Sequence, residues 1–317
     1  MQGTMNEAKK WMVETRVGGL FPEGRGEIFS VNTTTPIPEA FKLLIKHKIL
    51  SAPVYDIAAK KYIGWLDILD LVTHTINVLD ESELMGGELP LDVESSERFS
   101  KQTCGSIVGI SRRNPYYPVE KRAPLLKAIE AMVKYRLHRL PIIDEEGDLE
   151  TVVSQSHIAQ LLHQHMNVMG DLATATVAEL SLGLRQVITV TERNKAIEAF
   201  KLIHERNVSA IAVVSSGEEG AEQPAGSLIG NLSASDLKAV SYNAHMISNL
   251  FVSVKEFLGK LNTTKAPISV TVNHNFQEVV AKIVESRIHR VYVVDSENKP
   301  IGVISLLEVL SAIVERF

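Results

Sequence analysis

Four polar turns with the same internal spacing are the places in this chain where side chains could do chemistry. Each turn has a serine or aspartate in its middle and an acid or histidine three residues later. The turns are Gly64-x-x-Asp67-x-x-Asp70, Thr151-x-x-Ser154-x-x-His157, Gly230-x-x-Ser233-x-x-Asp236 and Gly302-x-x-Ser305-x-x-Glu308. A carboxylate there could accept hydrogen bonds from a ribose, and the positive start of a helix favours anionic ligands. The same spacing is that of a capping box, so any single turn leaves both interpretations open.

Two His-Arg pairs are the second chemical signal. His138-Arg139 and His289-Arg290 stand at equivalent positions ahead of the second and fourth turns. At the same positions ahead of the first and third turns the chain has Leu50-Ser51 and Ser209-Ala210. The guanidinium fork and a titratable imidazole suit a phosphate group. We therefore expect two charged corners that serve an anion between the repeats.

A cluster of three histidines, His157, His163 and His165, could indicate a metal site. His163 and His165 are two residues apart on an expected helix, so their side chains point in different directions. Metal sites need ligands that converge, so we expect no metal here.

The elements that position these residues recur four times. Each repeat contains an amphipathic helix, a short apolar strand, a turn, a second apolar strand and a second helix. The apolar strands that carry this repetition are Ser51–Asp56, His138–Asp144, Ser209–Ser215 and His289–Asp295. Self-similarity of this kind defines the architecture, because a single repeat cannot bury its own apolar face.

The repeats also suggest how the chain is divided. After an N-terminal lead of residues 1–26, we place the repeats at about 27–80, 107–166, 177–246 and 262–317, with an acidic linker at 80–106. A boundary near Gly170 then separates a first pair, 27–170, from a second pair, 171–317. We expect each pair to be compact and to fold by itself.

Composition excludes several classes of protein. The chain has 317 residues, of which 45% are hydrophobic and 22% charged, as in a globular protein. A net charge of −5 argues against a nucleic-acid partner, and no apolar run approaches the length of a membrane-spanning helix. A polar N-terminus and a single cysteine, Cys104, favour a reducing compartment, so we expect the protein in the cytoplasm and also in the nucleus. No phosphate-binding glycine loop or nucleophile elbow is present, so we expect no catalytic residues and no enzyme activity.

The strand–turn–helix pattern h-x-G-h-h-S-x-x-D resembles the cystathionine-β-synthase (CBS) motif, four times over nearly all of residues 27–317. The resemblance implies an α/β fold of four β-α-β-β-α motifs in two tandem pairs that form a pseudo-symmetric disc. Four CBS motifs with no other domain resemble the gamma subunit of the AMP-activated and sucrose-non-fermenting-type protein kinases. The specific matches are Ile288-His-Arg-Val-Tyr-Val-Val-Asp295, Leu137-His-Arg-Leu-Pro-Ile-Ile-Asp144, Asn207-Val-Ser-Ala-Ile211 and Phe251-Val-Ser-Val-Lys-Glu256.

This resemblance implies adenine nucleotides, AMP, ADP or ATP, as regulatory ligands between paired motifs, with no catalytic cofactor. Ribose would be held by Asp70, Asp236 and Glu308. The serines of the helix-cap turns, Ser154, Ser233 and Ser305, would also bind the nucleotide. Phosphates would be held by His138, Arg139, His289 and Arg290, and strand contacts would come from Ile188, Val208 and Ser209. Leu50 and Ser156 replace an Arg and a Lys of the animal subunits, and Ser154-Gln-Ser156 is closer to plant-type relatives. His157 replaces an acid and cannot accept a hydrogen bond when it is protonated.

The resemblance further implies a non-catalytic regulatory subunit of a Ser/Thr kinase, partnered by a catalytic alpha subunit and a bridging beta subunit. An alternative is a free-standing sensor of adenosyl ligands that regulates another enzyme or a transporter. Co-purification with a kinase distinguishes the two.

Overall fold

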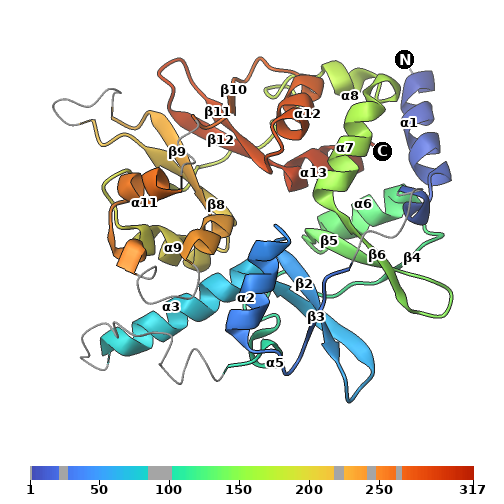
Figure 1. Ribbon diagram of the computed structural model, residues 1–317. Helices are drawn as coiled ribbons and strands as arrows, with labels where there is room; N and C mark the ends of the chain where they lie inside the picture. Colours follow the sequence, from blue (N-terminus) through green and yellow to red (C-terminus); the bar gives the residue numbers. More distant parts are fainter. Residues whose placement is uncertain (1, 21–27, 85–101, 218–224, 241–247, 262–265) are drawn as a thin grey trace. The chain divides into compact units, whose positions relative to one another are not determined.

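The structure is a computed structural model (Figure 1). It describes residues 2–20, 28–84, 102–217, 225–240, 248–261 and 266–317. Residues 85–101, which make up most of the expected acidic linker, lie outside the described residues.

Each of the four repeats contains a three-stranded sheet, as the sequence predicts. The first, very short strand runs parallel to the second, and the second pairs antiparallel with the third. Repeat 1 comprises β1 (Val31–Asn32), α2 (Ile37–Lys46), β2 (Ser51–Asp56), β3 (Lys61–Asp67) and α3 (Ile68–Leu84). Repeat 2 comprises β4 (Val119–Glu120), α6 (Leu125–Lys134), β5 (Arg139–Ile143), β6 (Leu149–Ser154) and α7 (Gln155–Gln164).

The second half of the chain repeats this order with one difference. Repeat 3 comprises β7 (Thr189–Thr191), α9 (Ala196–Glu205), β8 (Ala210–Val214), β9 (Leu228–Ser233) and the 3₁₀ helix η3 (Ala234–Val240). Repeat 4 comprises β10 (Ser269–Val270), α12 (Phe276–Glu285), β11 (Arg290–Val294), β12 (Pro300–Ser305) and α13 (Leu306–Arg316). The turn of repeat 3 is therefore followed by a 3₁₀ helix, whereas the turns of the other three repeats are followed by α-helices.

The remaining elements precede repeat 1 or lie in the connections between repeats. They are α1 (Gln2–Glu14), η1 (Val17–Leu20), α5 (Cys104–Ile107), η2 (Met166–Val168), α8 (Asp171–Thr174), η4 (Ser248–Phe251) and α11 (Val254–Lys260). None of the helices in the described part of the chain is both long enough and apolar enough to cross a membrane.

The first helix of every repeat ends in the same way. A residue with positive φ follows it, and the next amide donates to a carbonyl five residues back, at 2.9–3.1 Å. The positive-φ residues are Lys48 (54°), Arg136 (54°), Asn207 (51°) and Arg287 (54°). This left-handed cap satisfies helix carbonyls and redirects the chain into the next strand. It sets the position at which each His-Arg pair or its equivalent enters the sheet.

The chain separates into two compact units, each built from alternate repeats. We call them the odd-repeat unit (Phe29–Pro115 and Ile188–Ala266) and the even-repeat unit (Met1–Ile28, Tyr116–Val187 and Pro267–Phe317). This division differs from the expected boundary near Gly170, because residues 116–187 lie within one unit. Helix packing accounts for the difference, because α3 of repeat 1 contacts α9 and η3 of repeat 3, and α6 and α7 of repeat 2 contact α13 of repeat 4. Pairing of sequence neighbours through their sheets stays a prediction.

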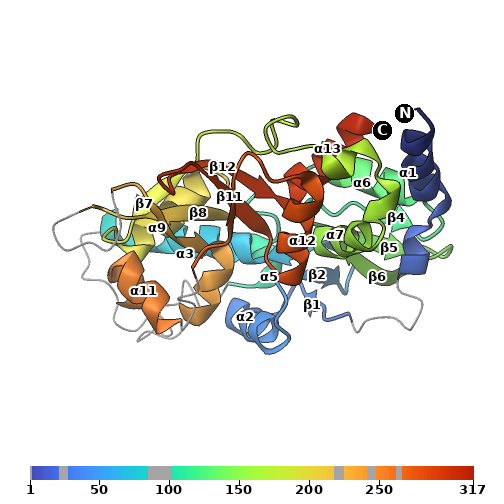
Figure 2. The ribbon, with the colours of Figure 1, turned by 90° about the horizontal axis from the view of Figure 1, so that it is seen from above.

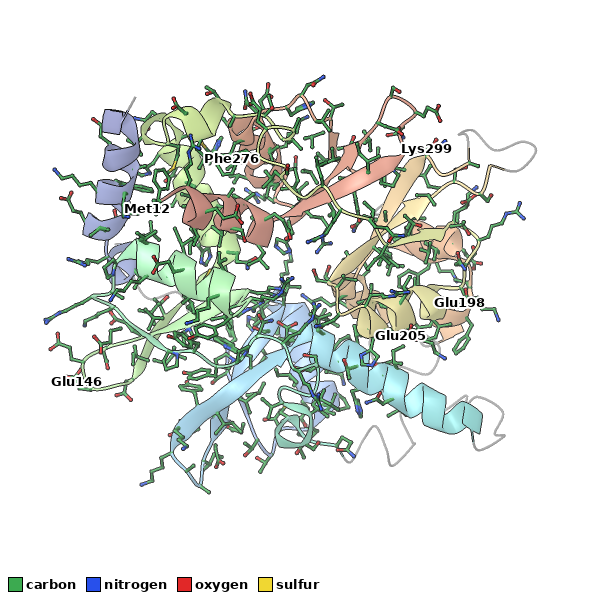
Figure 3. All side chains as sticks on the ribbon, turned by 180° about the vertical axis from the view of Figure 1, so that it is seen from behind. Met12, Glu146, Glu198, Glu205, Phe276 and Lys299 are labelled. Carbon is green, nitrogen blue, oxygen red and sulfur yellow. The ribbon has the colours of Figure 1, made fainter. Side chains whose placement is uncertain are left out.

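In the even-repeat unit, α6, α7, α12 and α13 pack around one apolar core (Figure 2). Fully buried side chains from three of these helices meet there, including Ile129, Phe276 and Ile313. Helix α1 adds Met12 to the same core (Figure 3). Complete burial of such a side chain stabilises the fold by about 1.5–3 kcal/mol relative to its exposure.

In the odd-repeat unit, α3 packs along α9 and η3. Phe200 of α9 meets Phe257 of α11 edge to face, with ring centroids 5.7 Å apart. A polar contact also joins the two repeats, because Thr73 Oγ1 lies 3.1 Å from His204 Nδ1. The two repeats of this unit thus share one core.

Candidate functional site

The four turns are built alike, as their spacing predicts. In each repeat the second residue of the His-Arg pair, or of the equivalent pair, lies directly across the hairpin from the central residue of the turn. These pairs are Ser51 with Asp67, Arg139 with Ser154, Ala210 with Ser233 and Arg290 with Ser305. The first residue of the exit helix then donates to the residue just before the second strand. These bonds are Ile68 N to Leu50 O (2.9 Å), Gln155 N to His138 O (3.0 Å), Ala234 N to Ser209 O (2.9 Å) and Leu306 N to His289 O (3.1 Å). The expected equivalence of these positions is confirmed.

The last residue of every turn folds back onto the backbone N–H three residues before it. The four bonds are Asp67 N to Asp70 Oδ2 (2.9 Å), Ser154 N to His157 Nδ1 (3.3 Å), Ser233 N to Asp236 Oδ2 (2.7 Å) and Ser305 N to Glu308 Oε2 (2.9 Å). The capping interpretation therefore describes all four turns. Binding of a ribose by the same side chains stays a prediction, because a carboxylate has further acceptor positions.

In repeat 1 the turn is closed by the chain itself. Asp70 is completely buried, and its second oxygen, Oδ1, accepts from Ser111 N at 2.9 Å. Asp67 is also buried and accepts from Leu69 N at 3.0 Å and from Asn114 Nδ2 at 3.0 Å. Burial raises the pKa of Asp70 to about 6, although the hydrogen bonds from Ser111 and Asp67 act against this rise. Both oxygens of Asp70 thus accept hydrogen bonds from backbone N–H groups of the chain itself.

In repeat 2 a histidine performs the capping role of the acid. His157 N donates to Ser154 Oγ at 3.3 Å, and His157 Nδ1 accepts from Ser154 N. Burial, together with the nearby charge of Arg139, lowers the pKa of His157. His157 is therefore held neutral, which is the form that can accept a hydrogen bond.

The turn of repeat 3 places two serine hydroxyls close to its acid. Asp236 is half-buried, and its Oδ2 also accepts from Ser233 Oγ at 2.8 Å. Ser235 Oγ lies 2.7 Å from Ser233 Oγ. A Cβ on Gly230 would lie 3.2 Å from Val213 Cβ and 3.5 Å from Leu258 Cδ1, so a side chain there would crowd the hairpin. The turn thus combines one carboxylate with two hydroxyls, and the backbone of its first residue, Gly230, packs closely against Val213 and Leu258.

The residues expected to make strand contacts lie in repeat 3, and one of them, Ser209, contacts its turn through the bond from Ala234 N. Ile188 O accepts from Ala212 N at 3.0 Å, at the entry of the sheet. Val208 and Ile188 are partly buried against the core of the odd-repeat unit, and Ser209 is half-buried. Their backbone positions fit the predicted role, whereas contact with a ligand stays a prediction.

In repeat 4 the acid of the turn makes an additional ion pair. Glu308 accepts from both Ser305 N and Ser305 Oγ through Oε2, while Arg185 Nη1 donates to Oε1 at 2.8 Å. Arg290 is half-buried opposite Ser305, and His289 is exposed. Burial raises the pKa of Tyr292 to about 12, with the charge of Arg290 acting in the opposite direction.

The charged positions are divided between the two units. Both His-Arg pairs, His138-Arg139 and His289-Arg290, belong to the even-repeat unit, whereas Asp70 and Asp236 belong to the odd-repeat unit. The structure therefore places the four candidate phosphate-binding residues within one compact unit. Their convergence on a single anion stays a prediction.

The histidine cluster is dispersed, as its spacing suggests. His165 stacks on Trp11 with ring centroids 4.5 Å apart, and His163 Nε2 lies 3.9 Å from Glu285 Oε1. Over the described ranges, no group of three His, Cys, Asp or Glu side chains could hold a metal ion.

Three contributors to these turns do not follow from the motif. Ser111, Asn114 and Arg185 all lie in connectors that precede a repeat, outside the repeated spacing. Because connectors have no periodicity, the sequence contained no signal that these residues contact the turns.

The comparisons with known proteins agree with this architecture. The family model described as CBS domain matches residues 25–76, 107–164, 177–242 and 254–315. The chain therefore belongs to the CBS domain family, with four copies of the domain and a three-stranded α/β sheet in each.

Among individual proteins, the chain is similar to kinase gamma subunits, which confirms the expected resemblance. It is 26% identical to the SNF1-related protein kinase regulatory subunit gamma-1 of Arabidopsis thaliana, over 90% of this chain and 78% of that protein. It is 24% identical to the human 5'-AMP-activated protein kinase subunit gamma-3, over 89% of this chain and 56% of that longer protein. Both relatives are gamma subunits by name, and the Arabidopsis protein is named as a regulatory subunit.

A solved structure shares the fold. It belongs to a Methanocaldococcus jannaschii protein described as a candidate archaeal homologue of g-AMPK. The match has a TM-score of 0.70 at 18% identity and covers 94% of this chain and 99% of that protein.

Proposed function

We propose that this protein is a non-catalytic regulatory subunit of a Ser/Thr protein kinase complex and that it binds adenine nucleotides at its repeated turns. The observation that supports this most strongly is the fourfold recurrence of one turn, with the same strand register and the same backbone hydrogen bonds. A capping box is local to the start of one helix. It does not require that the residue across the hairpin from it occupy the same position of the second strand in all four repeats. A common ligand-binding architecture provides a reason for that recurrence.

Within this proposal the turns have different roles. Asp236 of repeat 3 is the leading candidate to bind ribose, because it is half-buried and has two serine hydroxyls beside it. Within the even-repeat unit, Arg139 and Arg290 lie opposite the serines of their own turns and are the proposed phosphate-binding residues of those turns. A guanidinium fork binds phosphate oxygens in pairs, which suits a nucleotide better than a nucleoside.

Asp70 is the weakest of the three predicted ribose ligands. Its burial and its bond from Ser111 mean that a ligand must displace protein groups that already satisfy the carboxylate. Removal of a satisfied buried hydrogen bond costs about 1–3 kcal/mol. We therefore propose fewer occupied sites than turns.

The kinase assignment is supported by similarity to gamma subunits over about nine-tenths of the chain. A catalytic alpha subunit and a bridging beta subunit are the proposed partners, in the cytoplasm and the nucleus. Affinity purification of the tagged full-length chain from its own cells, followed by mass spectrometry, tests this assignment. Recovery of a kinase chain and a bridging chain in equal amounts is expected. Recovery of a transporter or a metabolic enzyme without a kinase would favour a free-standing sensor instead.

A further inference from the structure

The connector of residues 175–187, which precedes repeat 3, runs directly beside the turn of repeat 4. Gly183 O accepts from Val303 N of β12 at 3.0 Å. Gly183 has a φ of +66°, and a Cβ on it would lie 2.4 Å from Val303 O. Only glycine fits such a close backbone approach. The connector is thereby fixed against β12, two residues before Arg185.

Arg185 reaches the acid of the turn from this position. Its Nη1 donates to Glu308 Oε1 at 2.8 Å, while Glu308 Oε2 is bound by Ser305 N and Ser305 Oγ. The Glu308 side chain is 15% exposed and that of Arg185 is 51% exposed. The carboxylate that would receive a ribose is therefore covered, whereas the guanidinium can still move into solvent or toward a ligand.

Repeat 1 has a related arrangement in the other unit. There the following connector places Ser111 N 2.9 Å from Asp70 Oδ1. Gly64 provides the room, because a Cβ on it would lie 2.7 Å from Val108 Cγ2. Repeat 4 has the equivalent glycine on its third strand, because a Cβ on Gly302 would lie 2.8 Å from Gly183 O. In both units a glycine on the third strand thus lets a connector approach, and the connector then donates to the acid of the turn. The donor is a neutral backbone N–H in repeat 1 and a cationic side chain in repeat 4.

We propose that Arg185 is a specificity-determining residue that makes the turn of repeat 4 select nucleotides over nucleosides. The inference rests on the proposed function and extends it. An uncharged nucleoside must break the Arg185–Glu308 ion pair to reach Glu308 and offers Arg185 no new partner. A nucleotide breaks the same pair but provides phosphate oxygens that the guanidinium can bind in place of the carboxylate. The ion pair therefore weakens the binding of adenosine, whereas for AMP the new contact between Arg185 and the phosphate offsets the loss of the pair.

The test compares Arg185→Gln with a matched control, Arg316→Gln. Arg316 is an exposed residue on α13 of the same repeat, so both variants lose one positive charge from the same unit. Both are made in the full chain in an Asp236→Ala background, which weakens the repeat-3 turn, and are titrated with adenosine and AMP by calorimetry. Arg185→Gln should bind adenosine about three- to tenfold more tightly and lose most of its preference for AMP, because a partly exposed ion pair no longer has to open. Arg316→Gln should match the parent, and Arg185→Lys should restore part of the preference.

A measurement without ligand tests the role of Arg185 separately from the proposed nucleotide-binding function. Hydrogen exchange at the Val303 amide, which donates to Gly183, should be faster in Arg185→Gln than in Arg316→Gln. Equal exchange, or an unchanged adenosine affinity while AMP still binds, would overturn the role of Arg185 and leave the proposed function standing. Absence of AMP binding in the unmutated protein would refute both.

Discussion

The substitution Asp236→Ala separates ligand binding from helix capping at the turn of repeat 3. Asp236 accepts from Ser233 N at 2.7 Å and from Ser233 Oγ at 2.8 Å, so the alanine variant loses a cap worth about 0.5–2 kcal/mol of stability. If the carboxylate also binds ribose, charge-assisted hydrogen bonds worth about 1.5–3 kcal/mol are lost from binding. That loss corresponds to about ten- to a hundredfold weaker affinity for AMP.

Asp295 supplies the matched control for this substitution. It is half-buried at a hairpin turn and accepts from Glu297 N and Lys299 N, both at 2.9 Å, so it also satisfies two protein donors. Asp295→Ala should lower the free energy of unfolding by a similar amount and leave AMP affinity unchanged. The assay is calorimetry with AMP beside urea unfolding of the same samples. Equal AMP affinity in both variants would assign Asp236 to capping alone and refute its role in binding ribose.

Three further predictions concern pH, backbone fit and phosphate. The pKa of Asp70 is raised to about 6, so its contribution to stability is present below about pH 4 and is lost as pH rises through 6. Urea unfolding between pH 4.5 and 7 should show a fall of about 2 kcal/mol in the unmutated protein and not in Asp70→Asn, and parallel curves would contradict it. Gly183→Ala should lower the free energy of unfolding by about 1–3 kcal/mol more than Gly147→Ala does, because Gly147 also has a positive φ (+88°) but has open space around it. Equal losses would show that the structure near Val303 can shift to accept the added methyl group. Arg290→Gln should reduce the preference for AMP over adenosine and its sensitivity to salt, and an unmutated protein that binds both ligands equally would contradict a phosphate site.

The local parts of this structure could be predicted from the sequence because they depend on neighbouring residues. The hairpin register that places Arg139 opposite Ser154 and Arg290 opposite Ser305 follows from the alternation and spacing within each repeat. The same is true of the turn, since a capping residue and its acid are three positions apart. His157 was recognised as a departure, but its lowered pKa depends on burial and on Arg139, which spacing alone does not reveal.

The packing partners and the coverage of the turns could not be predicted in the same way. Alternate repeats share a core because helix faces such as those of α3 and α9 complement one another, and the sequence order of the repeats does not encode this choice. Asp70 and Asp236 have the same place in the motif, yet Ser111 covers Asp70 from a connector without periodicity. The motif defines which residue faces the turn, whereas the connectors determine whether a ligand can reach it.

The most direct test of the central claim is native mass spectrometry of the full-length protein after gentle purification, before and after addition of AMP. Retained ligand should add the mass of AMP, ADP or ATP, and added AMP should occupy fewer than four positions per chain. Absence of any adenine compound in the purified protein, together with no mass shift on addition of AMP, would contradict the account.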